Sequence, residues 1–137
     1  QTWEDPAHGH PDIPVSVASR GDNDPLDVVE LSNEPIAVGQ LCEVKVLGCL
    51  ALIDEGEIDW KLLAIRADDD RASQWRNVHD IDKNTVEKVV HWFRYYKTAD
   101  GKPENVFGLN GEVKDAKYTY DIIAKCHENW STIKNKH

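Results

Sequence analysis

The chain has 137 residues, of which 40% are hydrophobic and 30% charged, which fits one domain of ordinary size with a real core. Its 25 acidic and 16 basic side chains give a net charge of −9. Because contacts with phosphate groups dominate non-specific affinity for nucleic acid and anionic membranes, so acidic a chain is a poor candidate for binding either of them. No apolar run approaches the roughly 18 residues that a membrane span needs. We therefore expect a protein that holds cations, or that holds anions through cations.

The first half of the chain is predicted to form an irregular segment followed by strands. Prolines and glycines recur through residues 1–25, which indicates a long loop. A short strand is predicted at 28–31. A longer strand is predicted at 41–53, where Gly48 marks a bulge or a close backbone approach. Residues 60–67 form the next strand, and the tight acidic loop between the two long strands predicts a hairpin.

The second half is predicted to be mainly helical. Residues 68–80 are polar and irregular, and the period then changes to that of a helix over 82–97. The segment 106–111 is too short to assign. A closing helix is predicted at 115–134, with Asp115 as its N-cap. The apolar face of the first helix comprises Val86, Val89, Val90, Phe93 and Tyr96.

Two acidic clusters lie where a loop meets a strand. The first comprises Asp22, Asp24 and Asp27, and the second comprises Asp54, Glu55, Glu57 and Asp59. Each cluster alone also fits an acidic turn that caps a strand. If the two clusters face each other, their like charges raise one another's pKa, and divalent cations reverse that cost. Hard oxygen ligands suit Mg²⁺, Mn²⁺ or Ca²⁺ rather than Zn²⁺.

The stretch "GDNDPLDVVEL" resembles the signature of family I soluble inorganic pyrophosphatases, whose pattern is Asp-x-Asp-Pro-hydrophobic-Asp. The stretches "QTWEDP", "VKVLGCLALIDEGEIDWKLLAI", "HWFRYYKTADGKPEN" and "YDIIAKCHENW" agree in order and spacing, most closely with the eukaryotic branch. The resemblance covers nearly the whole chain. It implies an α+β fold, an OB-like antiparallel β-barrel with flanking helices that include a C-terminal helix. We expect residues 1–137 to be a single domain, the central to C-terminal part of a pyrophosphatase domain.

The resemblance also implies a role for each site residue. Asp22, Asp27 and Asp59 match the ligands of the tightest metal, and Asp27 also bridges to a second metal. Asp54 and Asp59 match ligands of further Mg²⁺ ions that arrive with substrate. Asp24 matches the catalytic residue that takes a proton from the nucleophilic water. The residues that match phosphate contacts are Lys61, Tyr96 and Lys97.

Residue types alone leave other interpretations open for several of these positions. Tyr96 also fits the last core residue of its helix, and Lys97 fits a charge that is favourable to the helix dipole. Lys61 fits a solvated strand residue. Trp60 and Trp92 are expected in the core rather than in a site.

The implied activity is Mg²⁺-dependent hydrolysis of pyrophosphate to two phosphates, so the chain is expected to be an inorganic diphosphatase. Pyrophosphate would be repelled by a bare acidic site, and cations bridge the two. Mn²⁺ or other divalent cations are expected to substitute for Mg²⁺. Phosphoryl transfer needs positioning and charge neutralisation more than covalent chemistry, which suits this set of residues.

The resemblance departs from the family pattern at the start of the chain. Family members carry a portion before "QTWEDP" that supplies the first barrel strands and further site residues, and this sequence contains no Met. We therefore expect a partial barrel without its first strands. The alternative function is that of a catalytically inactive, truncated or proteolysed metal-binding core. For the intact protein the resemblance implies a homodimer in the cytoplasm, or alternatively in the mitochondrial matrix.

Overall fold

The computed structural model describes residues 1–136, and the predicted end of the domain at residue 137 lies outside the described residues. The strands are β1 (Asp27–Glu30), β2 (Val44–Asp54), β3 (Glu57–Arg66), β4 (Val106–Phe107) and β5 (Lys114–Asp115). The helices are α1 (Lys83–Tyr95) and α2 (Ala116–Lys134), with short 3₁₀ turns at Asp70–Ser73, Val78–Asp80, Thr98–Asp100 and Leu109–Gly111. The expected α+β class with a C-terminal helix is confirmed. No helix among the described residues is both long and apolar enough to cross a membrane.

The strands form one open sheet in the order β1–β3–β2–β4, with β5 also pairing with β2. The described residues close no barrel, in agreement with the partial barrel that was expected. One pairing differs from the expectation, because β1 runs parallel to β3 whereas all other pairs are antiparallel. Because a long connection separates β1 from β2, β1 can pair with β3 in the parallel orientation.

The hairpin of β2 and β3 is confirmed, but its turn is shorter than the predicted acidic loop. Only Glu55 and Gly56 lie between the strands, and both have positive φ, 51° and 85°. Such values are typical of the two-residue turns that match the twist of a hairpin. As a result, Glu57 and Asp59 belong to β3 and not to the loop.

A bulge at Gly48 changes the face of β2 on which Leu47 lies. The register with β3 shifts between Val46 and Gly48. A Cβ atom on Gly48 would lie 2.4 Å from the Lys114 backbone oxygen, so β5 approaches the strand where only glycine fits. Because of the extra residue, Leu47 faces the same side as Leu50 instead of the opposite side. Both predicted roles of Gly48 are confirmed.

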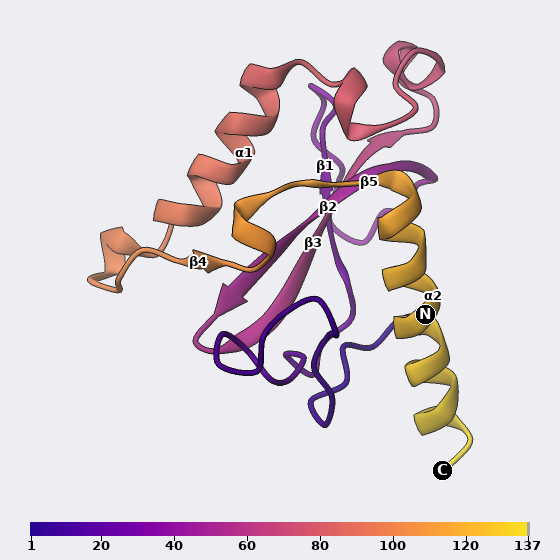
Figure 1. Ribbon diagram of the computed structural model, residues 1–137. Coiled ribbons are helices and arrows are strands. Elements are labelled where there is room, and N and C mark those ends of the chain that lie inside the picture. The colour runs from indigo at the N-terminus through magenta and orange to yellow at the C-terminus, as the bar shows by residue number, and fades with distance from the viewer. Residues whose placement is uncertain (137) are drawn as a thin grey trace.

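The two helices cover opposite faces of the sheet (Figure 1). On one face Ile122 and Cys126 of α2 pack against Cys49 and Ala51. On the other face Phe93 of α1 packs against the alternate residues of β2. Both helices begin at the predicted aspartates, since Asp82 accepts a hydrogen bond from the Thr85 amide (3.1 Å) and Asp115 accepts one from the Tyr118 amide (2.8 Å).

Candidate metal centre

Residues 21–26, which we call the aspartate loop, lie between the N-terminal segment and β3. Gly21 forms an isolated parallel bridge with Ile58 of β3. The Glu4 amide donates to the Asp24 carbonyl (2.9 Å), and the Asn23 amide donates to the Glu4 carbonyl (3.0 Å). A Cβ atom on Gly21 would lie 2.7 Å from the Glu4 carbonyl carbon, so the contact requires glycine. The loop is therefore held on both sides by backbone contacts.

Both predicted acidic clusters line one cavity of about 350 Å³, which we call the acidic cavity. Its lining residues are Arg20, Asp22, Asp24, Asp27, Asp54, Glu55, Glu57 and Asp59. The first cluster reaches it from the aspartate loop and the start of β1, and the second reaches it from the hairpin. The structure therefore brings together all five aspartates that were predicted as metal ligands or catalytic base.

Lys61 pairs with two of the aspartates that line the acidic cavity. Its Nζ donates to Asp27 Oδ2 (2.6 Å) and to Asp59 Oδ2 (2.8 Å). Burial alone would lower the pKa of Lys61, but these two hydrogen bonds outweigh it and raise the pKa. The side chain is only 8% exposed, so the interpretation of Lys61 as a solvated strand residue is wrong.

Three further cations pair with carboxylates around the hairpin turn. Lys97 donates to both carboxylate oxygens of Asp54. Lys102 Nζ lies 2.6 Å from Glu55 Oε1, and Arg20 lies 3.0 Å from Glu57 Oε1. The Lys97–Asp54 pair is the more buried of these, with side-chain exposures of 21% and 24%. Lys97 does not line the acidic cavity itself, but it contacts the cavity through Asp54, and its role as a phosphate contact stays a prediction.

Tyr96 lies apart from the residues that line the acidic cavity. Its ring stacks on Trp92, with centroids 4.7 Å apart, and packs edge-on against Phe93. The nearest link to the carboxylates is Lys97, whose Nζ lies 5.6 Å from the Tyr96 ring centroid. These contacts fit the core interpretation of Tyr96. Trp92 itself is 57% exposed, so its predicted place in the core is wrong.

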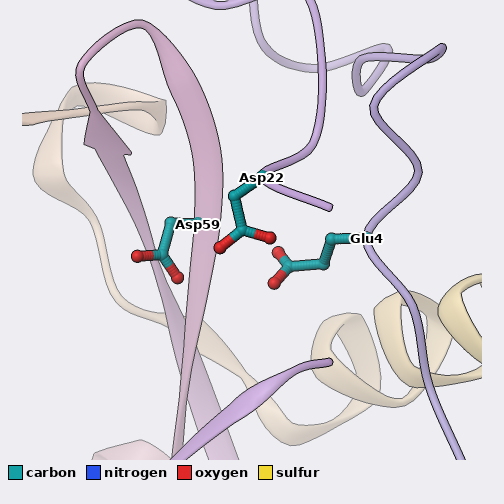
Figure 2. A group of neighbouring side chains, drawn as sticks. All are labelled: Glu4, Asp22 and Asp59. Atoms are coloured by element: carbon teal, nitrogen blue, oxygen red, sulfur yellow. The ribbon is translucent and has the colours of Figure 1, made fainter. Parts of the chain in front are cut away.

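Glu4 is a member of the centre that the sequence analysis missed. One oxygen each from Glu4, Asp22 and Asp59 lie within 4.8 Å of one another (Figure 2). Glu4 Oε1 accepts a hydrogen bond from the Trp60 amide (2.9 Å), and Glu4 itself is 3% exposed. The one available signal was that Glu4 lies inside the quoted "QTWEDP" stretch.

Burial raises the pKa of each carboxyl in this group of three. For Glu4 the increase is to about 9, although the hydrogen bond from Trp60 opposes it. Burial also raises the pKa of Asp22. For Asp59 the effect of burial exceeds that of Lys61, which lowers the pKa. Burial therefore disfavours the ionised form of all three carboxyls, and a bound cation would favour it.

The donor set fits a hard divalent cation. Asp59 Oδ1 is buried and has no hydrogen-bond partner among residues 1–136, and buried oxygens without partners are rare in folded proteins. The cavity offers carboxylate oxygens from two sides and no thiolate or imidazole. That composition is typical of Mg²⁺, Mn²⁺ and Ca²⁺ sites and disfavours Zn²⁺. Fold and site together define an α+β protein with a carboxylate centre of the type that holds hard cations.

Comparison with known proteins identifies the family. The family model for inorganic pyrophosphatase matches residues 1–131, and the chain belongs to this family. The human inorganic pyrophosphatase is 46% identical over 139 aligned positions, which cover 99% of this chain and 47% of the human one. The chain spans about half the length of the curated relatives that it matches.

Solved structures agree with this assignment. The inorganic pyrophosphatase of Schistosoma japonicum superimposes with a TM-score of 0.90 at 41% identity, covering 96% of this chain and 46% of that one. The N-terminal domain truncated vacuolar soluble pyrophosphatase of Trypanosoma cruzi, solved in complex with PPi, gives a TM-score of 0.88 at 34% identity, covering 98% of this chain and 50% of that one. The resemblance noted in the sequence is therefore confirmed.

Proposed function

We propose that this chain carries the carboxylate part of a Mg²⁺-dependent inorganic pyrophosphatase centre, which hydrolyses pyrophosphate to two phosphates. The observation that carries the proposal is the gathering of two acidic clusters, which are distant in the sequence, in one cavity. Membership of the pyrophosphatase family supports it, as does the PPi complex of the Trypanosoma cruzi relative.

In this proposal Asp22, Asp27 and Asp59 hold the tightest cation, and Asp54 joins Asp59 in holding further ones. The unpartnered oxygen of Asp59 supports its place in both sets. Mg²⁺ is the proposed physiological ion, with Mn²⁺ or other divalent cations able to substitute. When bound, such cations neutralise the charge of pyrophosphate and lower the pKa of the attacking water.

Asp24 is the proposed general base. It lies exposed in the aspartate loop, and its carboxylate accepts no hydrogen bond from residues 1–136, so its lone pairs stay available for a proton. The backbone around it is fixed, because its amide donates to Asp22 Oδ1 (3.0 Å) and its carbonyl accepts from the Glu4 amide. A base with a free carboxylate on a fixed backbone suits abstraction of a proton from water.

Lys61 and Lys97 are proposed to contact phosphate oxygens. An ammonium group has three N–H donors. Lys61 donates one hydrogen bond to Asp27 and one to Asp59, and Lys97 donates one to each carboxylate oxygen of Asp54. Each lysine therefore keeps one donor for a phosphate oxygen. Tyr96 stays a proposed third contact through its hydroxyl.

Metal binding without turnover is the second candidate function. The observation that favours it is the engagement of both lysines with carboxylates of the same cavity. In that case the chain would bind Mg²⁺ as an inactive core.

The test is phosphate release from pyrophosphate by the 137-residue chain, in Mg²⁺ and in EDTA, alongside Mg²⁺ titration by calorimetry. Release that requires Mg²⁺ would support the enzyme. Mg²⁺ binding without phosphate release would support the inactive core. The absence of both Mg²⁺ binding and phosphate release would refute both candidate functions. Asp27→Asn removes one proposed ligand, and Asp121→Asn is its matched control, because it removes the same charge from the exposed side of α2.

The compartment, the assembly and the domain count also stay proposals. Cys42, Cys49 and Cys126 are free thiols, which is typical of a reducing compartment. This supports the cytoplasm, with the mitochondrial matrix as the alternative. A homodimer of the intact protein and a single domain over residues 1–137 follow from the resemblance.

A further inference from the structure

Glu4 connects the two parts of the chain that present Asp22 and Asp59. Its backbone binds the aspartate loop in both directions, since its amide donates to the Asp24 carbonyl and its carbonyl accepts from the Asn23 amide. Its side chain crosses to β3 and accepts the Trp60 amide. A single residue thus contacts both sides of the acidic cavity.

The contact with Trp60 fills a gap in the sheet. Alternate amides of a strand point to the same edge, so those of Ile58, Trp60 and Leu62 face the side of β3 on which β1 lies. The Ile58 amide donates to the Arg20 carbonyl (2.8 Å), and pairing with β1 begins only at Lys61. Between these two points the chain leaves the sheet as the aspartate loop. Glu4 Oε1 takes the place of the missing strand carbonyl.

The second oxygen of Glu4 faces the proposed ligands. Figure 2 shows the carboxyl of Glu4 directed at Asp22, with Asp59 on the far side of Asp22. Glu4 Oε2 is buried and has no hydrogen-bond partner among the described residues. The carboxyl therefore lies next to Asp22, on the side away from Asp59.

We infer that Glu4 is a positioning residue, which sets the separation of Asp22 and Asp59 by tying the aspartate loop to the Trp60 amide. The inference rests on the proposed function of the acidic cavity as a cation site. In this role the length and hydrogen-bonding capacity of the Glu4 side chain are essential, and its negative charge is not. If Glu4 were instead a direct cation ligand, its charge would be the essential property.

Three substitutions separate length from charge. Glu4→Gln keeps the length and an oxygen for the Trp60 amide but removes the charge, whereas Glu4→Asp keeps the charge but is too short to reach. Glu4→Ala removes both. We expect Glu4→Gln to bind Mg²⁺ within about threefold of the unchanged chain, and Glu4→Asp and Glu4→Ala to bind it about 10–100-fold more weakly, the usual cost of losing a residue that orients metal ligands.

Glu30→Ala is the matched control for a merely structural role. Glu30 Oε1 also accepts an amide of β3, that of Arg66 (2.8 Å), but at the end of the strand away from the acidic cavity. Glu30→Ala should lower the unfolding temperature in EDTA and leave the Mg²⁺ affinity unchanged. An equal loss of Mg²⁺ affinity in Glu30→Ala and Glu4→Ala would overturn the inference.

Amide hydrogen exchange in EDTA provides a readout that needs no metal. The Trp60 amide should be protected in the unchanged chain and in Glu4→Gln, and should exchange faster in Glu4→Asp and Glu4→Ala. Weak Mg²⁺ binding by Glu4→Gln with Trp60 still protected would overturn the inference, because the charge would then be what matters. No Mg²⁺ binding by the unchanged chain would instead refute the proposed function.

Discussion

Replacing Lys61 by Met should destabilise the metal-free protein and make Mg²⁺ a stronger stabiliser. Lys61 and Asp59 are both buried, with side-chain exposures of 8% and 10%, so the substitution leaves a buried carboxylate without its cation. Removing one partner of such a pair costs about 3–5 kcal/mol. The second partner, Asp27, is 63% exposed, and its bond adds at most about 1 kcal/mol.

Protonation of Asp59 limits this loss. Without Lys61 the pKa of Asp59 rises further above its ordinary value, so the native state takes up a proton and avoids the bare charge. The expected loss at pH 8 is therefore about 3 kcal/mol, the lower end of that range. For a chain of this size it lowers the unfolding temperature by about 10 °C. The loss should shrink as the pH falls from 8 to 5.

The assay is thermal unfolding of both proteins in EDTA and in Mg²⁺. A cation bound between Asp27 and Asp59 replaces the charge of Lys61, so Mg²⁺ should raise the unfolding temperature of Lys61→Met more than that of the unchanged chain. Lys125→Met is the control, since the Lys125–Glu128 pair is exposed on α2 and should cost less than about 0.5 kcal/mol. A Lys61→Met protein as stable as this control in EDTA, or an equal response to Mg²⁺, would refute the reasoning.

Four further outcomes are expected. Asp27→Asn should weaken Mg²⁺ binding at least tenfold by calorimetry, the usual scale for residues at a metal site, and an unchanged titration would remove it from the ligand set. If the chain turns over pyrophosphate, Asp24→Asn should depress phosphate release about 10²–10⁴-fold while sparing Mg²⁺ affinity; parental rates across the pH range would exclude it as the base. The pKa of Glu4 rises from 4.5 to about 9 on folding, so the native state binds the extra proton and stability in EDTA should fall as the pH rises through that window. Thermal unfolding of Glu4→Gln should lack this slope, and identical slopes would contradict the assignment. Gly48→Ala places a Cβ atom 2.4 Å from the Lys114 backbone oxygen and should cost about 1–3 kcal/mol in denaturant unfolding, and an unchanged unfolding midpoint would contradict the close approach of β5.

The local elements of the fold were predictable because their signals lie within a few residues of one another. Asp82 and Asp115 cap the helices that follow them, and the sequence predicted the cap for Asp115 and the start of the helix for Asp82. The hairpin followed from two apolar runs on either side of Gly56. By contrast, β1 has only four residues, and so short a run contains no information about whether its partner is parallel or antiparallel.

The site was predictable where residues recur in a motif and was missed where a contact spans the chain. The aspartates stood out as two clusters. Glu4 did not, because its partners Asp22 and Trp60 lie far from it in sequence, and its own segment has no periodicity. Only the folded chain shows that a carboxylate completes the edge of β3.

Trp92 and Tyr96 show the limit of helical periodicity. A pattern of apolar residues predicts which face of α1 packs on the sheet, but not how far that face extends around the helix. Phe93 is buried at the centre of the face, whereas Trp92 is mostly exposed beside it and stacks on Tyr96. The ring of Trp92 is thus covered by its neighbour on the helix rather than by the core.

The contacts of the N-terminal segment also set an order of events during folding. The Trp3 amide donates to the Cys126 carbonyl (3.0 Å), and the Gln1 carbonyl lies 2.8 Å from His127 Nδ1, so the first residues of the segment contact α2, whose residues lie up to 126 positions away in the sequence. Contacts between such distant residues form late and slowly, while the hairpin needs only its own turn. The nascent chain should therefore form the β2–β3 hairpin before the first residues of the chain dock on α2.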